Sequence, residues 1–159
     1  PQQFRGSVQI ITGTVGADIT TPWINLENKV IIQHTTNDSV LPAPLVILQH
    51  RLYYHGSWFR HAMDAQMGVD LRYFTPYHSP VVCPATGMFA TQQEVKIGNY
   101  TWMSVYANFY VRSIRLRFFA HYQHFNHLFM KKNIGYLAMP DYPTNRDVFR
   151  AGLAWHFYN

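Results

Sequence analysis

Apolar and polar residues alternate one by one along much of the chain. The clearest case is residues 62–75. The apolar residues Met63 and Leu71 lie at odd-numbered positions there, and Asp64 and Asp70 lie at even-numbered positions, so the two kinds have opposite parity. Side chains of an extended strand point alternately to opposite faces, whereas a helix repeats its apolar positions at every third or fourth residue. This segment is therefore predicted to be a strand with one apolar face and one polar face.

The same alternation predicts further strands, separated by turn-forming and proline-rich segments. The predicted strands, about seven in all, span residues 4–16, 23–36, 45–57, 62–75, 89–112, 114–125 and 147–159. The fifth is longer than a bilayer crossing requires, so we expect it to project beyond the membrane or to break at Gly98-Asn99, for example at a bulge. Short connections alternate with long ones, and the long ones are residues 37–44, 76–88 and 126–146.

The last stretch, residues 147–159, indicates what surrounds the sheet. Phe149, Leu153, Trp155 and Phe157 alternate there with polar or small residues. On a soluble edge strand such an apolar row invites aggregation, but on a strand that faces lipid it does not. The segment is long enough for a tilted bilayer crossing, and outer-membrane barrels carry aromatic residues near their strand ends. We predict the closing strand of an all-β, antiparallel transmembrane outer-membrane β-barrel, with the short turns and the chain end on the periplasmic side.

Composition favours this barrel over a soluble β-sandwich, which would bury the same apolar residues against a second sheet. Aromatic residues make up 16% of the chain and charged residues only 13%, and no run of about 18 apolar residues predicts a membrane helix. The net charge of +5 is dispersed singly along the strands, so no nucleic-acid partner is expected. The expected partner of the outward faces is outer-membrane lipid.

The predicted strand number is odd, whereas single-chain bacterial barrels have an even number, from about eight upward. The first strand is also predicted to run toward the periplasm. We therefore expect residues 1–159 to be the C-terminal portion of a single, larger transmembrane β-barrel domain. No secretory signal is recognised at Pro1, so the sequence is expected to be a mature or an N-terminally shortened chain. Cys83, the only cysteine, is predicted to lie in a loop, either free or paired with a cysteine outside this sequence.

Several segments resemble one known family. They are WINLENKV (23–30), LYYHGSWF (52–59), GVDLRY (68–73), EVKIGNY (94–100) and the terminal FRAGLAWHFYN. The chain is similar to the C-terminal region of the putative porin family of Bacteroidota outer membranes. The segment TNRD before the last strand and the final Asn159 depart from the pattern of that family. The resemblance implies an outer-membrane barrel, but transport of a particular solute does not follow from it.

The inward, polar parity carries the candidate functional residues. Charged residues predicted to line the pore are Lys29, Arg51, Asp64, Asp70, Arg72, Glu94, Lys96, Arg115, Arg117 and Arg150. Arg5 and Glu27 are assigned to the same inward face. The basic excess of this set predicts a solute path that favours anions. The alternative is a lumen sealed by ion pairs between strands, and strands outside this sequence would change the charge balance.

Other candidate chemistry is weaker. Tyr100 and Trp102 either line a sugar path by stacking or pack within the aromatic girdle or the lumen. His121, His124 and His127 form an HxxHxxH pattern. On one strand the first and last would lie about 20 Å apart and the middle one would face away, so no metal site is expected. No catalytic constellation or cofactor motif is recognised, so neither enzyme activity nor a cofactor is predicted.

Three functions remain open. The first is a passive or selective pore for small solutes in the bacterial outer membrane. The alternative is a non-enzymatic barrel subunit of a larger outer-membrane complex for secretion, assembly or uptake. In that case the loops or the lipid-facing surface bind other outer-membrane proteins, and the chain has no open pore of its own. An outer-membrane enzyme is the function least supported by the residues.

Overall fold

The computed structural model describes residues 4–128, 137–142 and 144–157. The described strands are β1 (Ile10–Thr20), β2 (Ile24–Thr35), β3 (Val46–Trp58), β4 (Met63–Phe74), β5 (Val81–Cys83), β6 (Met88–Ala90), β7 (Tyr100–Val111), β8 (Leu116–Gln123) and β9 (Val148–Trp155). A 3₁₀ helix, η1, covers Phe125–Leu128. In this part of the chain, no helix has the length and apolar character needed to span a membrane. Parts of the predicted last loop (129–136 and 143) and the end of the predicted terminal strand (158–159) lie outside the described residues.

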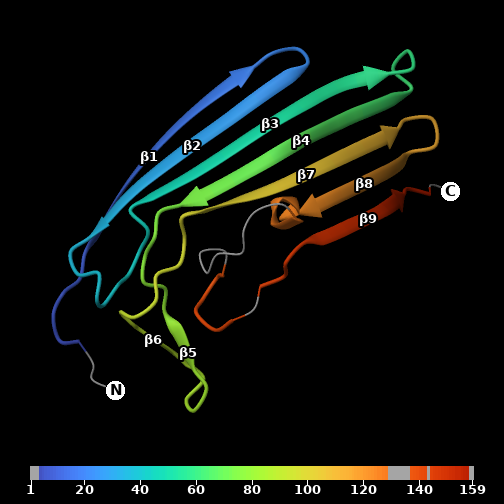
Figure 1. The fold of residues 1–159 in the computed structure, drawn as a ribbon. Helices are drawn as coiled ribbons and strands as arrows, with labels where there is room; N and C mark the ends of the chain where they lie inside the picture. The colour runs from blue at the N-terminus through green and yellow to red at the C-terminus, as the bar shows by residue number, and fades with distance from the viewer. Residues whose placement is uncertain (1–3, 129–136, 143, 158–159) are drawn as a thin grey trace.

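One antiparallel sheet contains seven of the described strands, in the order β1-β2-β3-β4-β7-β8-β9. The β5 and β6 strands pair with each other as a separate hairpin. Figure 1 shows the long strands side by side, with this hairpin beyond the ends of β4 and β7. The predicted all-β antiparallel class is confirmed. The sheet is not closed into a barrel, because β1 and β9 each pair with one strand only among the described residues.

The strand register keeps the two parities on opposite faces across the sheet. Glu27 of β2 pairs with Arg51 of β3, whereas Leu26 pairs with Leu52. Residues directly opposite each other in an antiparallel pair point to the same side of the sheet. The sheet therefore has a polar face and an apolar face, as the alternation of the sequence predicts.

Short turns join the strands at one end of the sheet, and long segments join them at the other. The short turns are residues 21–23, 59–62 and 112–115, and the long segments are residues 36–45, 75–99 and 124–147. Phe59, Arg60 and His61 adopt φ values of 53°, 57° and 68°, so the β3–β4 turn is built from left-handed backbone. Both β1 and β9 run from the long-segment end toward the short-turn end. The predicted distribution of short and long connections is confirmed.

The first strand lies further along the chain than the alternation predicts. It spans Ile10–Thr20 rather than residues 4–16. Asp18, which lies beyond the end of the predicted strand, is a ladder residue of β1. The turn is confined to residues 21–23, where Pro22 has no N–H group to donate to the ladder.

The fifth predicted strand is also shorter than expected. The structure forms β7 only from Tyr100 to Val111, whereas residues 89–112 were expected to be continuous or interrupted near their middle. Gly98 and Asn99 both have positive φ, at 105° and 55°, and the chain breaks there. Of the two predicted alternatives, a strand that projects beyond the membrane and a break at Gly98-Asn99, the break is confirmed.

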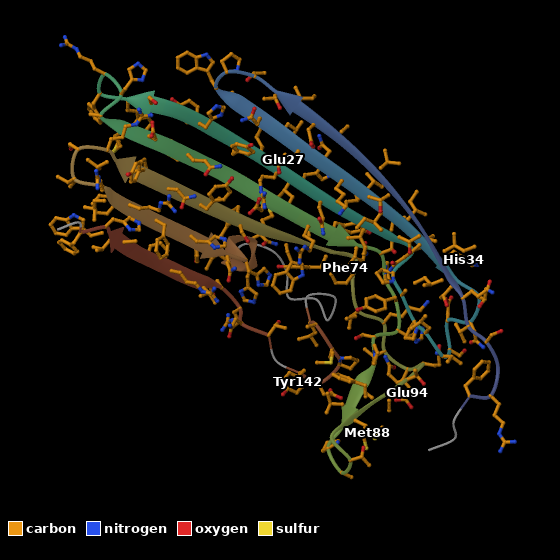
Figure 2. The ribbon with its side chains drawn as sticks, turned by 180° about the vertical axis from the view of Figure 1, so that it is seen from behind. Glu27, His34, Phe74, Met88, Glu94 and Tyr142 are labelled. Atoms are coloured by element: carbon orange, nitrogen blue, oxygen red, sulfur yellow. The ribbon has the colours of Figure 1, made fainter. Side chains whose placement is uncertain are left out.

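Residues just before this break lie outside the main sheet. Ile97 exchanges two backbone hydrogen bonds of 3.0 Å with Tyr77 and is only 1% exposed. Ile97 is therefore apolar because it is buried among the loops, and not because it belongs to a strand of the main sheet. Figure 2 shows Glu94, near Met88, beyond the ends of the long strands. The prediction that Glu94 and Lys96 occupy a polar strand face is therefore wrong.

The sixth predicted strand, residues 114–125, is trimmed at both ends. β8 begins at Leu116 and ends at Gln123. Arg115 has a φ of 52° and lies in the preceding turn, so its predicted position on a strand is wrong. His124, with a φ of 57°, turns the chain out of the strand and into η1.

Candidate functional site

Polar side chains on neighbouring strands, most of them charged, form a row across the polar face. This row consists of Glu27, Arg51, Asp70 and Ser104, which are successive partners across β2, β3, β4 and β7; we call it the ion-pair row. Arg51 Nη1 lies 3.3 Å from Glu27 Oε2, and Arg51 Nε lies 2.7 Å from Asp70 Oδ1. Tyr53 Oη also donates to Glu27 Oε1 at 3.2 Å. One guanidinium group therefore joins carboxylates from the strands on both sides.

The ion-pair row orients these side chains more than it stabilises the fold. The Arg51, Glu27 and Asp70 side chains are 51%, 43% and 36% exposed. Ion pairs exposed to this extent contribute about 0–1 kcal/mol each. Because two carboxylates share one guanidinium group, the row keeps a net negative charge.

The next row toward the long-segment end carries cations. It consists of Lys29, Gln49, Arg72 and Trp102, again successive partners across β2, β3, β4 and β7; we call it the cationic row. Among the described residues, neither Lys29 nor Arg72 takes part in an ion pair. Their strands are separated by one intervening strand, which places the two backbones about 10 Å apart. The polar face is thus divided into a negative row and a positive row.

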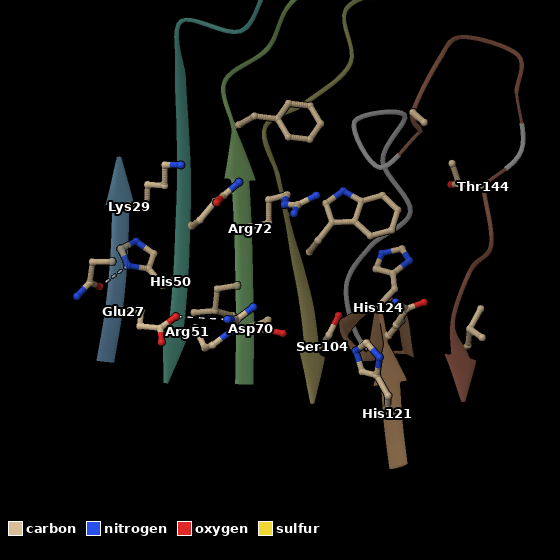
Figure 3. A pocket seen from close by; sticks show the side chains of 18 of the residues that line it. Glu27, Lys29, His50, Arg51, Asp70, Arg72, Ser104, His121, His124 and Thr144 are labelled. Carbon is tan, nitrogen blue, oxygen red and sulfur yellow. Dashed lines mark hydrogen bonds and ion pairs between the residues drawn. The ribbon is translucent and has the colours of Figure 1, made fainter. Parts of the chain in front are cut away.

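Both rows line a cavity of about 920 Å³ on the polar face. His121 and His124 line it from the β8 side, and Ala138 and Thr144 line it from the segment before β9. Figure 3 shows Arg51 between Glu27 and Asp70, with Lys29 and Arg72 displaced toward the same end of their strands. A cavity of this size is large enough for a small solute.

The η1 segment is held against the beginning of β7 by the side chain of Asn126, which forms the hydrogen bonds that a neighbouring strand would otherwise make. Asn126 donates from its amide to the Thr101 carbonyl oxygen at 2.7 Å and accepts from the Met103 N–H at 3.0 Å. β8 ends at Gln123 and pairs only as far along β7 as Val105. The Asn126 side chain therefore satisfies the backbone groups of β7 that β8 does not reach.

His124 connects this segment to the cavity wall. Its Nε2 lies 2.7 Å from Tyr100 Oη, and its ring stacks on Trp102 with centroids 4.1 Å apart. The side chain is only 2% exposed. Burial lowers the pKa of His124 below its ordinary value, and the nearby His127 lowers this pKa further.

A second charged cluster lies at the short-turn end of the sheet. Arg112 donates from Nε and Nη2 to the two oxygens of Asp64, at 2.8 Å and 2.7 Å, and Ser57 Oγ donates to Asp64 at 2.7 Å. The hydrogen bonds with Asp64 raise the pKa of Arg112. Nearby, the Arg117 guanidinium carbon lies 5.9 Å from the centre of the Tyr110 ring.

The apolar face exposes large side chains along most of the sheet. Exposed examples are Ile24, Leu52, Phe118, Phe149, Leu153 and Trp155. A soluble protein covers such a continuous apolar surface with a second layer or a partner. A polar pair interrupts the face, because Asn28 Oδ1 and His50 Nδ1 lie 2.6 Å apart on β2 and β3.

Comparison with known families points to a class of protein in which a sheet has one polar and one apolar face. A family model described as putative porin matches residues 1–159, the whole of the sequence. The chain belongs to the putative porin family. No curated protein and no solved structure matches it. Membership makes this a porin-like protein at the family level and implies a bacterial outer-membrane location.

The charged residues predicted to line the pore fall into distinct groups in this porin-family chain. Those that line the cavity are Lys29, Arg51, Asp70 and Arg72. Those on polar strand positions outside the cavity lining are Asp64, Arg117 and Arg150. Those outside the strands of the main sheet are Glu94, Lys96 and Arg115. The alternation in the sequence thus identifies the residues of the polar face. The register of the strands then determines which of these charged residues line the same cavity.

The histidine pattern has a different geometry from the predicted one. His121 lies on β8, but the chain turns after Gln123 and brings the His124 and His127 rings to within 5.3 Å of each other. The predicted extended spacing of the histidines is therefore wrong. Within the described ranges, no group of three or more His, Cys, Asp or Glu residues is arranged to hold a metal ion.

The cluster around Asn126 is not predicted by the sequence analysis. The strand was expected to continue to residue 125, which would leave no reason for Asn126 to cover β7. Its only sequence signal is an asparagine among aromatic residues and histidines at a strand end.

Cys83 lies in the β5–β6 hairpin as a free, partly exposed thiol. Hydrogen bonds with the Thr86 side chain and with the backbone of Ala85 and Thr86 lower the pKa of the Cys83 thiol. Pairing with a cysteine outside this sequence stays a prediction.

Proposed function

We propose that this chain forms part of the wall of an outer-membrane porin and that its polar face lines an aqueous path for small solutes. One observation carries the proposal: the same strands present a charged, hollowed face on one side and exposed apolar side chains on the other. In a bilayer the apolar face needs no second protein layer, and the sheet satisfies the backbone groups of its inner strands. Membership of the putative porin family supports the same function.

The strand lengths and connections suit this placement. The central strands β2, β3, β4 and β7 contain 12 or 13 residues each, and a tilted strand needs about 9–11 residues to cross a bilayer. Outer-membrane barrels have short periplasmic turns and longer extracellular loops. We therefore place the turns at residues 21–23, 59–62 and 112–115 in the periplasm and the long segments outside the cell.

Closure of this wall requires strands in addition to those described. β1 and β9 run in the same direction, so joining them directly would create a parallel pair in an otherwise antiparallel sheet. An odd number of further strands between them would keep every pair antiparallel and make the total even, as in single-chain bacterial barrels. We propose that the chain supplies the C-terminal strands of such a larger barrel.

Thiol accessibility combined with conductance tests the proposed path. In the complete gene product carrying Cys83→Ser, one variant places a thiol on the polar face (Ser104→Cys) and its control places one on the apolar face (Leu52→Cys). We expect a charged, membrane-impermeant thiol reagent to react with the Ser104→Cys protein and to reduce its conductance in planar bilayers. The Leu52→Cys protein should resist the reagent because lipid covers the thiol. Equal reactivity of the two variants, or a complete protein without conductance, would contradict the porin proposal.

The Asn28–His50 pair favours a second candidate function, that of a barrel subunit in a larger outer-membrane complex. Polar side chains that face acyl chains are costly, whereas a partner protein can offer them hydrogen bonds. Purification in mild detergent would test this candidate by comparing the wild-type protein with an Asn28→Leu/His50→Leu variant. A partner that copurifies only with the wild-type protein supports the complex. Conductance of the purified protein without any partner supports the pore.

A further inference from the structure

The charge pattern inside the cavity is specific enough to suggest a class of solute. Lys29 and Arg72 of the cationic row have no ion pair among the described residues, and Gln49 lies between them in the register. Two cations on one face, with a hydrogen-bonding amide between them, can hold one carboxylate or phosphate group. The cationic row therefore offers a place for a single anionic group.

An aromatic side chain lies directly beside these cations. Trp102 is the register partner of Arg72 and lines the same cavity. His124 stacks on the Trp102 ring at 4.1 Å and is itself held by Tyr100 Oη at 2.7 Å, so the indole is fixed in place. His124 covers one face of the indole, so a sugar ring can pack on the opposite face.

Hydrogen-bond acceptors stand on the adjacent row. Asp70 lies two residues along β4 from Arg72, a rise of about 7 Å, which a hexose with its substituents can span. Arg51 holds Asp70 through Oδ1, which leaves Asp70 Oδ2 without a hydrogen bond among the described residues. Carboxylate oxygens in this position can accept from sugar hydroxyl groups.

From these three features we infer that the cavity is a binding site for an anionic monosaccharide, a hexose ring that carries one carboxylate or phosphate group. The anionic group binds Lys29 and Arg72, the ring packs on Trp102, and a hydroxyl group donates to Asp70. This inference rests on the proposed function, because it places the cavity inside the aqueous path. A sugar without the charge lacks the contact with the cations, and a small anion without the ring lacks the contact with the indole.

Binding of glucuronate to the complete protein in detergent, measured by calorimetry, tests the inference. Glucose and the methyl ester of glucuronic acid lack the charge, and acetate lacks the ring. We expect glucuronate to bind at least about tenfold more tightly than each of the three, since one charge-assisted contact changes affinity by roughly that factor. This comparison needs no variant, so it stands even if a substitution prevents folding. Equal affinity for glucuronate and its methyl ester would overturn the inference.

Variants then locate the site. Arg72→Gln and Lys29→Gln should each weaken glucuronate binding about tenfold, and Trp102→Leu should weaken glucuronate binding while leaving acetate binding unchanged. The matched control is Arg150→Gln, which removes a cation from the polar face outside the cavity lining. An equal effect of Arg150→Gln and Arg72→Gln would overturn the inference, because it would indicate a general attraction to positive charge.

Planar-bilayer recordings separate this inference from the porin proposal. Conductance that glucuronate blocks and its methyl ester does not block supports both. Conductance that neither sugar blocks, together with no binding by calorimetry, leaves the pore standing and overturns the sugar site. Selective glucuronate binding without any conductance leaves the sugar site standing and overturns the pore.

Discussion

At the scale of single residues, parity along a strand decides what a side chain meets. Val69 is the seventh of the 12 residues of β4 and shares a face with Leu52. Ser104 lies on the neighbouring β7 and shares the opposite face with Asp70. These two positions differ in surroundings while lying at comparable depth along the sheet.

Replacement of Val69 by arginine should therefore destabilise the protein far more than the same replacement of Ser104. An arginine that faces lipid near the bilayer midplane costs about 2–4 kcal/mol, whereas an arginine that faces the lumen stays hydrated. Urea titration of the complete protein folded into lipid vesicles, followed by tryptophan fluorescence, measures both variants. An equal loss of stability in Val69→Arg and Ser104→Arg would show that the apolar face does not meet lipid.

Protonation of His124 should loosen the η1 segment. Burial depresses the pKa of His124, so the unfolded segment binds a proton more readily than the folded one. Stability is therefore unaffected at pH values well above about 6.5, and it falls as the pH drops through that value. Of the groups that face this ring, His127 lowers the pKa further and Asp147 raises it, while Tyr100 Oη bonds the ring.

An NMR titration of the His124 ring, in the complete protein in detergent micelles, measures this effect. We expect a midpoint below about 6.5, with hydrogen exchange in residues 124–128 faster at pH 5 than at pH 7.5 after correction for the intrinsic rate. His124→Gln should abolish the excess exchange at low pH. A midpoint above the ordinary histidine value would refute the prediction.

At the scale of elements, β7 is longer than its partner β8, and the side chain of Asn126 covers the difference. Asn126→Leu removes the acceptor of the Met103 N–H and the donor to the Thr101 carbonyl oxygen. Leaving such groups without a partner costs about 1–3 kcal/mol. We expect faster hydrogen exchange at the Met103 amide and unchanged exchange at Val105, which pairs with Tyr122 of β8. Unchanged exchange at Met103 would show that the η1 segment does not protect β7.

The terminal strand β9 should be required for assembly. Deletion of residues 149–159 leaves the β8 edge without its partner. In lipid no water can satisfy the exposed backbone groups, and each costs several kcal/mol. We expect the truncated protein to lose the heat-dependent shift in electrophoretic mobility that marks a folded barrel. Deletion of residues 82–89 from the β5–β6 hairpin is the control and should keep the shift, because the hairpin lies outside the main sheet. A folded barrel without β9 would overturn the prediction.

At the scale of the whole molecule, both edges of the sheet need partners. The β1 residues are exposed throughout, and only the edge toward β2 is paired among the described residues. In the complete protein we expect another strand to pair with the free edge. Hydrogen exchange should then protect every amide of β1, and not only the alternate amides that point toward β2. Rapid exchange of alternate amides would indicate an open edge, and direct pairing of β1 with β9 would contradict the larger barrel.

The sequence by itself determined which residues lie on each face of the sheet and that the strands are antiparallel. Alternation has a period of two residues and is local, so residues 62–75 were sufficient to predict β4 and the side of the sheet on which Asp64 and Asp70 lie. The short connections are too short for a crossover between parallel strands, which agrees with the antiparallel pairing that the sequence analysis predicts. Short motifs such as GVDLRY (68–73) carried the resemblance to the putative porin family, which the family match confirms.

Only the tertiary structure decided where the strands end and which charges meet. A strand ends where its partner ends or where burial elsewhere is more favourable, and neither is visible in local alternation: Ile97 has the parity of a strand but is buried among the loops. The register is likewise a relation between distant segments. It joins Arg51 to two carboxylates and leaves Arg72 beside Trp102, although both arginines occupy polar positions of alternating strands. The faces follow from the spacing of residues along one strand, whereas the cavity follows from the alignment of several strands and the folding of the loops over them.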